Sequence, residues 1–160
     1  GRIWAESDPG NGSVFWFTIP LFIDERPAPA AGPRRAVLVC DDDKDLVEVL
    51  CAALAARGNS AVAAHTGAEA IARFDAAPSD VVVVDLVLPD MNGREVIRHV
   101  HSTSPETRII VYTAAYVEQA DRDFMRGAGA TIVTKGRVSP DQLADEAAQL
   151  VSESPVRMTG

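Results

Sequence analysis

Residues capable of chemistry stand directly after four short apolar runs of this sequence. The runs are rich in valine and isoleucine and read AVLVC, VVVV, RIIVY and TIVT. The residues that follow them are Asp41, Asp42, Asp85, Thr113 and Lys135. Apolar runs of this length are typical of strands buried on both faces of a parallel sheet. Because open α/β sheets place their ligand sites at the carboxyl ends of the strands, we expect these side chains to lie together.

Such a group has the parts that phosphoryl transfer to a carboxylate requires. Three carboxylates in one pocket repel each other, so a positive partner must neutralise them. Mg²⁺ suits this place because it prefers hard oxygen ligands, usually one or two carboxylates with water and phosphate. The ammonium group of Lys135 adds a point charge suited to a phosphoryl group. The hydroxyl of Thr113 can donate a hydrogen bond to a phosphoryl oxygen, so that nucleophile, charge neutralisation and positioning are all present.

Each of these residues also has a plainer interpretation when it is taken alone. One of the aspartates in Asp41–Asp43 can cap the helix that follows, and Asp43 suits that role best. Asp85 can cap its strand or loop, Thr113 can simply end a strand, and Lys135 can be a solvated loop residue. Their occurrence at successive strand ends favours the common site.

Strands and helices alternate from Ala36 onward. Apolar runs predict strands over 36–40, 61–65, 81–85, 108–112 and 131–134. Apolar residues at helical spacing predict helices over 46–54, 68–75, 96–100 and 117–126. A last helix is expected to begin at Ser139-Pro140, with a capping box between Ser139 and Gln142, and to continue to Val151. These units predict an α/β fold, a five-stranded parallel sheet with helices on both faces.

The first part of the chain follows a different pattern. Two aromatic-rich runs, 2–6 and 13–21, flank a segment dense in turn-forming residues, which predicts a β-hairpin. The stretch FIDERPAPAAGPRR then changes to proline, alanine, glycine and charge, which is typical of an extended linker. We therefore expect a hairpin (1–22), a linker (23–35), the α/β domain (36–152) and a tail (153–160).

Composition narrows the class of protein. The chain has 160 residues, 47% of them hydrophobic, and a formal net charge of −8 without any basic run, which argues against a nucleic-acid surface. It has no apolar stretch long enough to span a membrane, and its first ten residues lack a secretory signal pattern. We expect a cytoplasmic chain in which Cys40 and Cys51 are free, buried thiols.

Residues 36–152 resemble the receiver domain of two-component response regulators. The resemblance rests on the motifs VLVCDDD, VVVVDLVLPDMNG, IIVYTA and TIVTK, which occur in the right order and at suitable spacing. It implies a flavodoxin-like fold with Asp85 as the phosphoacceptor, Thr113 as the switch hydroxyl and Lys135 as the phosphate-binding lysine. The Mg²⁺ ligands that it implies are Asp41, Asp42, Asp85 and the backbone carbonyl of Val87.

The first 21 residues, GRIWAESDPGNGSVFWFTIPL, resemble the closing hairpin of the ATP-binding domain of sensor histidine kinases. The nucleotide-binding boxes of that family lie upstream of this hairpin, so the resemblance implies no ATP site here. Together the two resemblances imply a receiver domain from the C-terminal end of a hybrid histidine kinase. The implied partner is a phosphohistidine donor, either a histidine kinase or a histidine phosphotransfer protein, and a homodimer is a second candidate assembly.

Two other classes of protein share some of these sequence features. A degenerate receiver would act as a protein-interaction module without phosphorylation, but none of the expected site residues is lost. A haloacid-dehalogenase-type phosphatase also uses a strand-end aspartate and Mg²⁺, but it requires a second aspartate two residues later, where this chain has Val87.

The chain departs from the receiver pattern at two positions. Gly136 follows Lys135 where receivers usually have proline, often after a cis bond; without proline we expect a trans bond. Ile132 stands where receivers often have an aromatic switch residue.

Val87 and Ala115 occupy two variable positions that, in receivers, flank the path of water to the phosphoryl group, and neither side chain can orient water. We therefore expect a long-lived aspartyl phosphate. The histidines His65, His99 and His101 are expected to be ordinary surface or edge residues.

Overall fold

The computed structural model describes residues 2–8, 12–18 and 36–153. The chain divides into two compact units, residues 1–30 and 31–160. The first contains a hairpin in which β1 (Arg2–Asp8) pairs antiparallel with β2 (Gly12–Thr18). Both strands extend into the segment predicted as the turn, because Ser7 and Asp8 pair with Ser13 and Gly12. The predicted continuation of the second strand to residue 21 lies outside the described residues.

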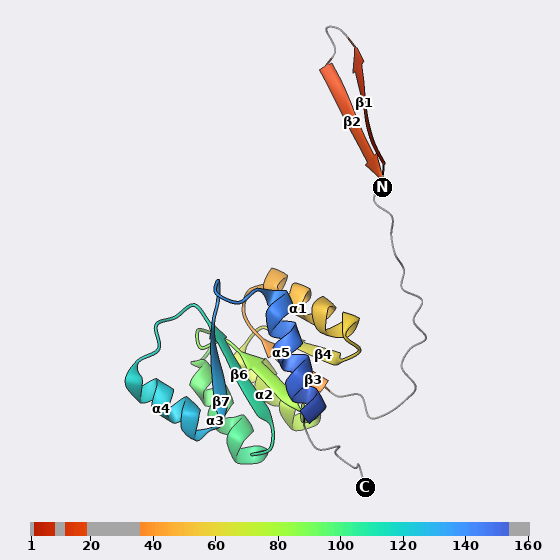
Figure 1. Ribbon diagram of the computed structural model, residues 1–160. Helices are drawn as coiled ribbons and strands as arrows, with labels where there is room; N and C mark the ends of the chain where they lie inside the picture. Colours follow the sequence, from red (N-terminus) through yellow and green to blue (C-terminus); the bar gives the residue numbers. More distant parts are fainter. Residues whose placement is uncertain (1, 9–11, 19–35, 154–160) are drawn as a thin grey trace. The chain divides into compact units, whose positions relative to one another are not determined.

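The second unit is built on one parallel sheet with the strand order β4-β3-β5-β6-β7 (Figure 1). Its strands are β3 (Ala36–Cys40), β4 (Ser60–Ala64), β5 (Val81–Val84), β6 (Arg108–Thr113) and β7 (Ala130–Thr134). Its helices are α1 (Lys44–Ala56), α2 (Gly67–Ala76), α3 (Gly93–Thr103), α4 (Gln119–Gly127) and α5 (Pro140–Glu153). The predicted fold class is confirmed.

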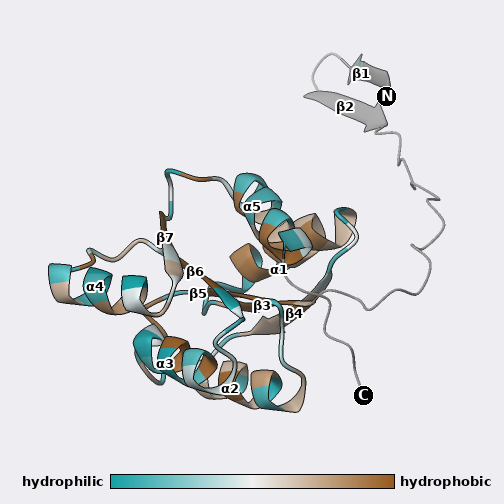
Figure 2. Cartoon of the chain, turned by 60° about the horizontal axis from the view of Figure 1, so that its bottom comes forward, coloured by the Kyte–Doolittle hydropathy of each residue, from teal (hydrophilic) through white to brown (hydrophobic). Residues whose placement is uncertain are grey.

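Helices cover both faces of the sheet, with α1 and α5 on one side and α2 and α3 on the other (Figure 2). The central strand β5 shows why both faces must be covered. Val82 and Val84 belong to the core cluster beneath α2, α3 and α4, whereas Val81 and Val83 belong to the cluster beneath α1 and α5. All four valines are buried, as expected of a strand whose side chains alternate between two packed faces.

The helix starts follow from the side chains that precede them. Asp43 caps α1, because its side chain accepts a hydrogen bond from the Leu46 N–H at 3.1 Å. The predicted capping box opens α5: Ser139 Oγ accepts from the Gln142 N–H, and Gln142 Oε1 accepts from the Ser139 N–H.

The predicted start of α4 was wrong by two residues. Val117 is an apolar residue that packs into the core from the preceding loop, so its hydrophobicity did not indicate helix.

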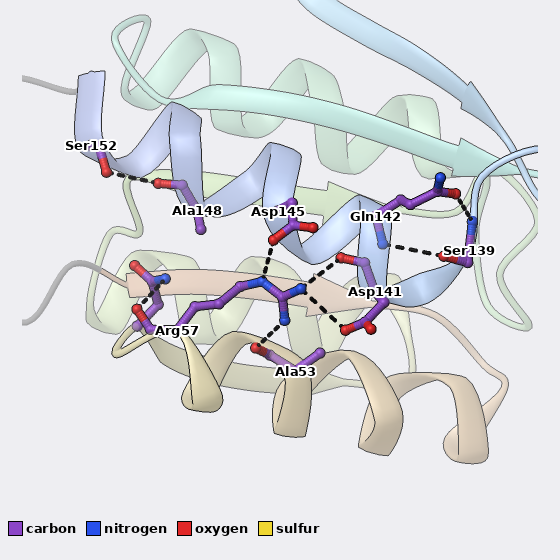
Figure 3. A network of polar contacts seen from close by, with 9 residues as sticks. Ala53, Arg57, Ser139, Asp141, Gln142, Asp145, Ala148 and Ser152 are labelled. Carbon is purple, nitrogen blue, oxygen red and sulfur yellow. Dashed lines mark hydrogen bonds and ion pairs between the residues drawn. The ribbon is translucent and has the colours of Figure 1, made fainter. Parts of the chain in front are cut away.

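Arg57, directly after α1, makes polar contacts that join α1 to α5 on the face of the sheet that both helices cover (Figure 3). Arg57 Nε donates to Asp145 Oδ1 at 2.6 Å, and Nη2 donates to Asp141 Oδ1 at 3.1 Å. A third donor of the same guanidinium, Nη1, bonds the Ala53 carbonyl one turn back along α1. The contact fixes the C-terminal end of one helix against the N-terminal half of the other.

The two cysteines are free, as predicted, and they differ in burial. Cys40 is buried in β3, where burial raises the pKa of its thiol to about 12. Cys51 is only half-buried on α1, so the prediction that both thiols are buried was wrong for this residue. Each helix in the described part of the chain is too short or too polar to span a lipid bilayer.

Candidate functional site

Three of the predicted site residues meet at the carboxyl edge of the sheet. Asp41 follows β3 and Asp85 follows the adjacent strand β5, so parallel pairing brings their side chains to the same place. Lys135 follows β7 and reaches both of them: its Nζ lies 2.6 Å from Asp41 Oδ2 and 2.6 Å from Asp85 Oδ2. The ammonium therefore bridges two carboxylates that would otherwise repel each other.

Asp42 completes a group of three carboxylates. One carboxylate oxygen from each of Asp41, Asp42 and Asp85 lies within 4.8 Å of the others. Asp41 and Asp85 are 3% and 6% exposed, whereas Asp42 is exposed to solvent. Hard oxygen donors at the mouth of a buried acidic pocket fit the donor set that Mg²⁺ prefers. The residues present therefore suit such an ion.

Burial and the ion pair act in opposite directions on this group. Burial raises the pKa of the Asp41 carboxyl, and the hydrogen bond from Lys135 only partly offsets this effect. Burial also disfavours the charged form of Lys135, but its hydrogen bonds to Asp41 and Asp85 outweigh burial and raise the pKa of the ammonium. Lys135 is therefore charged at neutral pH and supplies the fixed positive charge of the pocket.

The loop after β5 is folded tightly around Asp85. The Val87 N–H donates to Asp85 Oδ1 at 3.2 Å, and Val87 pairs with Asn92 in an isolated β-bridge. The Gly93 N–H bonds the Leu86 carbonyl at 2.9 Å. A Cβ on Gly93 would lie only 2.1 Å from the Asp85 carbonyl oxygen, so this position requires glycine. The sequence placed Gly93 in a turn but did not reveal this close approach.

Thr113 is buried at the end of β6, on the far side of β5 from Asp41. Its Oγ1 accepts a hydrogen bond from the Ala115 N–H at 3.2 Å, and its carbonyl accepts one from the Lys135 N–H at 2.9 Å. The backbone thus ties Thr113 to the lysine that contacts Asp85. The arrangement places a hydroxyl, an ammonium and the aspartates along one edge of the sheet.

The comparisons with known proteins agree with this geometry. Residues 37–148 match the profile of the family described as "Response regulator receiver domain". The chain belongs to the response regulator receiver family. This receiver is similar to the transcriptional regulatory protein TrcR of Mycobacterium tuberculosis, with 39% identity over 85 residues that cover 53% of the chain and 33% of TrcR. It is also similar to the sensor kinase CckA of Brucella abortus, with 28% identity over 137 residues that cover 75% of the chain and 14% of CckA.

Solved structures show the same fold. A CheY-like receiver domain protein from Methanospirillum hungatei is 25% identical and superimposes with a TM-score of 0.69, covering 76% of this chain and 96% of that one. The chemotaxis protein CheY4 of Vibrio cholerae, also 25% identical, gives a TM-score of 0.64 and covers 73% and 98%. The chain spans a third of TrcR and less of CckA, whereas it spans nearly all of these single receiver domains.

The receiver departs from the usual pattern after Lys135, as the sequence indicated. No peptide bond of the described residues is cis, and Gly136 has a φ of +85°. This left-handed conformation suits glycine and would strain proline, whose φ is fixed near −65°. The expected trans bond is confirmed, and glycine lets the loop turn where the lysine side chain points back to Asp85.

Two further contacts of the receiver could not be predicted from the sequence. Asp90, in the loop after β5, accepts hydrogen bonds from the Gly67 and Ala68 N–H groups at 2.8 and 2.9 Å and so caps α2 from a distant part of the chain. His65, expected to be an ordinary surface or edge residue, is half-buried, and its Nδ1 lies 3.2 Å from the Asp41 carbonyl oxygen. His99 on α3 pairs with Asp75 on α2, with 2.7 Å between His99 Nε2 and Asp75 Oδ1. His101 is exposed.

Proposed function

We propose that this receiver accepts a phosphoryl group on Asp85 from a phosphohistidine donor, with Mg²⁺ as cofactor. The observation that carries the proposal is the bridging ammonium of Lys135, held 2.6 Å from both Asp41 and Asp85 in a buried pocket. A purely structural ion pair would not need a third carboxylate, that of Asp42, at the pocket mouth. A site that binds a phosphoryl group together with a metal ion does need this third carboxylate, because the metal ion requires several oxygen ligands.

The transfer forms one bond and breaks one. A carboxylate oxygen of Asp85 attacks phosphorus, and the bond between phosphorus and the imidazole nitrogen of the donor breaks, leaving the electron pair on that nitrogen. Asp41, Asp42, Asp85 and the carbonyl of Val87 would hold Mg²⁺, which neutralises charge on the transferring group when bound.

Lys135 and Thr113 act on the product. The ammonium of Lys135 already lies at hydrogen-bonding distance from Asp85 Oδ2, so a small movement lets it bind a phosphoryl oxygen instead. The hydroxyl of Thr113 now accepts from the Ala115 N–H. Turning that hydroxyl to donate to a second phosphoryl oxygen would draw the loop after β6 toward Asp85.

The wider context of the chain is part of the same proposal. We propose that the chain comes from a hybrid histidine kinase, with its hairpin derived from the kinase's ATP-binding domain. The similarity to a sensor kinase supports this context, as does the resemblance of the first 21 residues. The donor would be a histidine kinase or a histidine phosphotransfer protein, as for other receiver domains.

The test uses two small phosphodonors, acetyl phosphate and phosphoramidate, whose P–N bond mimics phosphohistidine. With Mg²⁺, the wild-type chain should gain the mass of one phosphoryl group, and Asp85→Asn should gain none, because the amide is not a nucleophile. Asp42→Ala should react more slowly and need more Mg²⁺. Asp75→Asn, an exposed aspartate on α2, is the matched control and should react like the wild type.

The same experiment separates the alternative function. A degenerate receiver that signals through protein contacts alone would show no mass gain in the wild type at any Mg²⁺ concentration. A mass gain that persists in Asp85→Asn would instead assign another residue as the acceptor.

A further inference from the structure

A second hollow in this unit carries no acidic residue among the described ones that line it. It is a cavity of about 400 Å³ formed by the end of β6 and the loop after it, by α4, and by β7 and the loop after it. The side chains that matter here are Thr113, Tyr116, Val117, Arg122, Ile132 and Arg137. Thr113 is shared with the candidate phosphorylation site, but the three aspartates of that site are not part of this lining.

The charge of the cavity comes from two arginines. Arg122 Nε donates to the Val117 carbonyl at 3.0 Å, which holds this guanidinium against the loop after β6. Neither Arg122 nor Arg137 pairs with a carboxylate of the described residues, although Arg57, Arg73, Arg94 and Arg126 all do. In a chain with a formal net charge of −8, two such unneutralised guanidinium groups in one hollow favour an anion.

The rest of the cavity offers apolar surface. Val117 is buried, Ile132 is half-buried, and Tyr116 is 87% exposed. An exposed aromatic ring beside a cavity provides a flat face on which another ring can pack. The cavity volume also lies in the range of small-molecule sites, about 300–1,000 Å³, where apolar walls combine with a few polar groups that fix orientation.

We propose that this cavity binds a small organic anion, a carboxylate or phosphate attached to an aromatic or other apolar group. Arg122 and Arg137 bind the anionic oxygens, since the planar guanidinium matches the geometry of both groups. The apolar part packs against Val117, Ile132 and the ring of Tyr116. The two arginines come from α4 and from the loop after β7, so the ligand would connect these two segments.

The test uses phenylphosphonate, because its C–P bond cannot donate a phosphoryl group to Asp85. The ¹⁵N-labelled full chain is titrated without Mg²⁺ and with EDTA, and amide resonances are followed by NMR. The resonances of 114–117 and Arg137 should shift and saturate. Methylphosphonate, which lacks the ring, should bind more weakly, and benzyl alcohol, which lacks the charge, should not shift these resonances. Because phenylphosphonate cannot transfer a phosphoryl group and no Mg²⁺ is present, the result does not depend on whether Asp85 can be phosphorylated.

Substitutions of single arginines test whether phenylphosphonate binds in this cavity. Arg137→Gln and Arg122→Gln should each raise the dissociation constant of phenylphosphonate about tenfold, the loss expected for a hydrogen bond to a charged group. Arg126→Gln removes the same charge from an exposed position of α4 outside the cavity and should bind like the wild type. The spectra themselves report whether each variant is folded. Absence of a saturable shift in the wild type, or an unchanged dissociation constant in Arg137→Gln, would overturn the proposal.

Discussion

At the scale of single residues, Gly93 determines how closely α3 approaches the strand end that carries Asp85. A methyl group there would meet the Asp85 carbonyl oxygen at 2.1 Å, and the obstacle is backbone, which cannot move aside like the end of a side chain. Gly93→Ala should therefore lower the free energy of unfolding by about 1–3 kcal/mol, the usual cost of overpacking. It should also slow phosphorylation, because relief of the clash displaces Asp85.

Gly127→Ala is the matched control for this change. Gly127 ends α4, has no positive φ, and a Cβ there meets nothing within 4 Å. Alanine should therefore raise the free energy of unfolding by about 0.5 kcal/mol through its better helix propensity. Urea denaturation of both variants checks the pair. Equal stabilities for the two variants would contradict the close approach at Gly93.

Val87 and Ala115 bear on how long the phosphoryl group would remain on Asp85. Val87 is 62% exposed and its N–H bonds Asp85 Oδ1, while the Ala115 N–H bonds Thr113 Oγ1. Neither side chain carries a hydrogen-bonding group that could orient water at Asp85. The double variant Val87→Asn, Ala115→Glu should therefore lose the phosphoryl group about tenfold faster, because positioned water attacks phosphorus more readily.

The decay is measured by intact mass at fixed Mg²⁺ after removal of the phosphodonor. The single variants distinguish the two positions, since only one of them need orient the attacking water. Decay in the wild type that is as fast as in the double variant would show that these side chains do not set the lifetime.

At the scale of elements, Asp90 joins the loop after β5 to the start of α2. Its carboxylate accepts hydrogen bonds from the Gly67 and Ala68 N–H groups, which lowers its pKa below the ordinary 3.8. A carboxyl whose pKa is lower in the folded state stabilises the fold above its unfolded pKa, and this contribution is lost as pH falls through the folded value. Asp90→Ala should thus weaken α2 at neutral pH.

Hydrogen exchange of the α2 amides measures this effect. The amides of 67–70 should exchange faster in Asp90→Ala than in the wild type near neutral pH. Urea denaturation should show the stability difference narrowing as the pH falls below 3.8. A difference that stays constant through the acid range would mean that charge on Asp90 is not what stabilises the helix start.

Elements also show what could be predicted from the sequence. The valine run of β5 could be recognised because a strand buried on both faces needs apolar residues at every position, and parallel pairing then places Asp41 and Asp85 together. The contact of Asp90 with α2 could not be predicted, since it joins a loop to a helix start more than twenty residues away and leaves no periodic signal. The start of α4 was misplaced because Val117 is buried without being helical.

The cavity beside α4 was missed for a related reason. Arg122 and Arg137 are separated by a turn and a strand, and neither belongs to a motif. Only the packing of α4 against β7 brings them to one hollow. The individual roles of the aspartates, Thr113 and Lys135 remain predictions, although the structure gathers the aspartates around Lys135.

At the scale of the whole molecule, the two units have separate hydrogen-bonded sheets. One sheet contains only β1 and β2, and the other contains the five strands of the receiver. Deleting residues 1–30 should therefore leave the melting temperature of the receiver within about 2 °C of the full chain. Differential scanning calorimetry of the two proteins measures this. A large fall on deletion would mean that the hairpin stabilises the receiver.

The strand order also has a consequence for synthesis on the ribosome. β3 is the first receiver strand to be made, and the next two, β4 and β5, are its neighbours in the sheet. After that, β6 is added beside β5 and β7 beside β6. Each strand after the first thus emerges when a partner already exists, and domains generally fold in this N-terminal-first direction. Lys135 comes after the last strand, so a nascent chain gathers its aspartates before it acquires the cation that neutralises them.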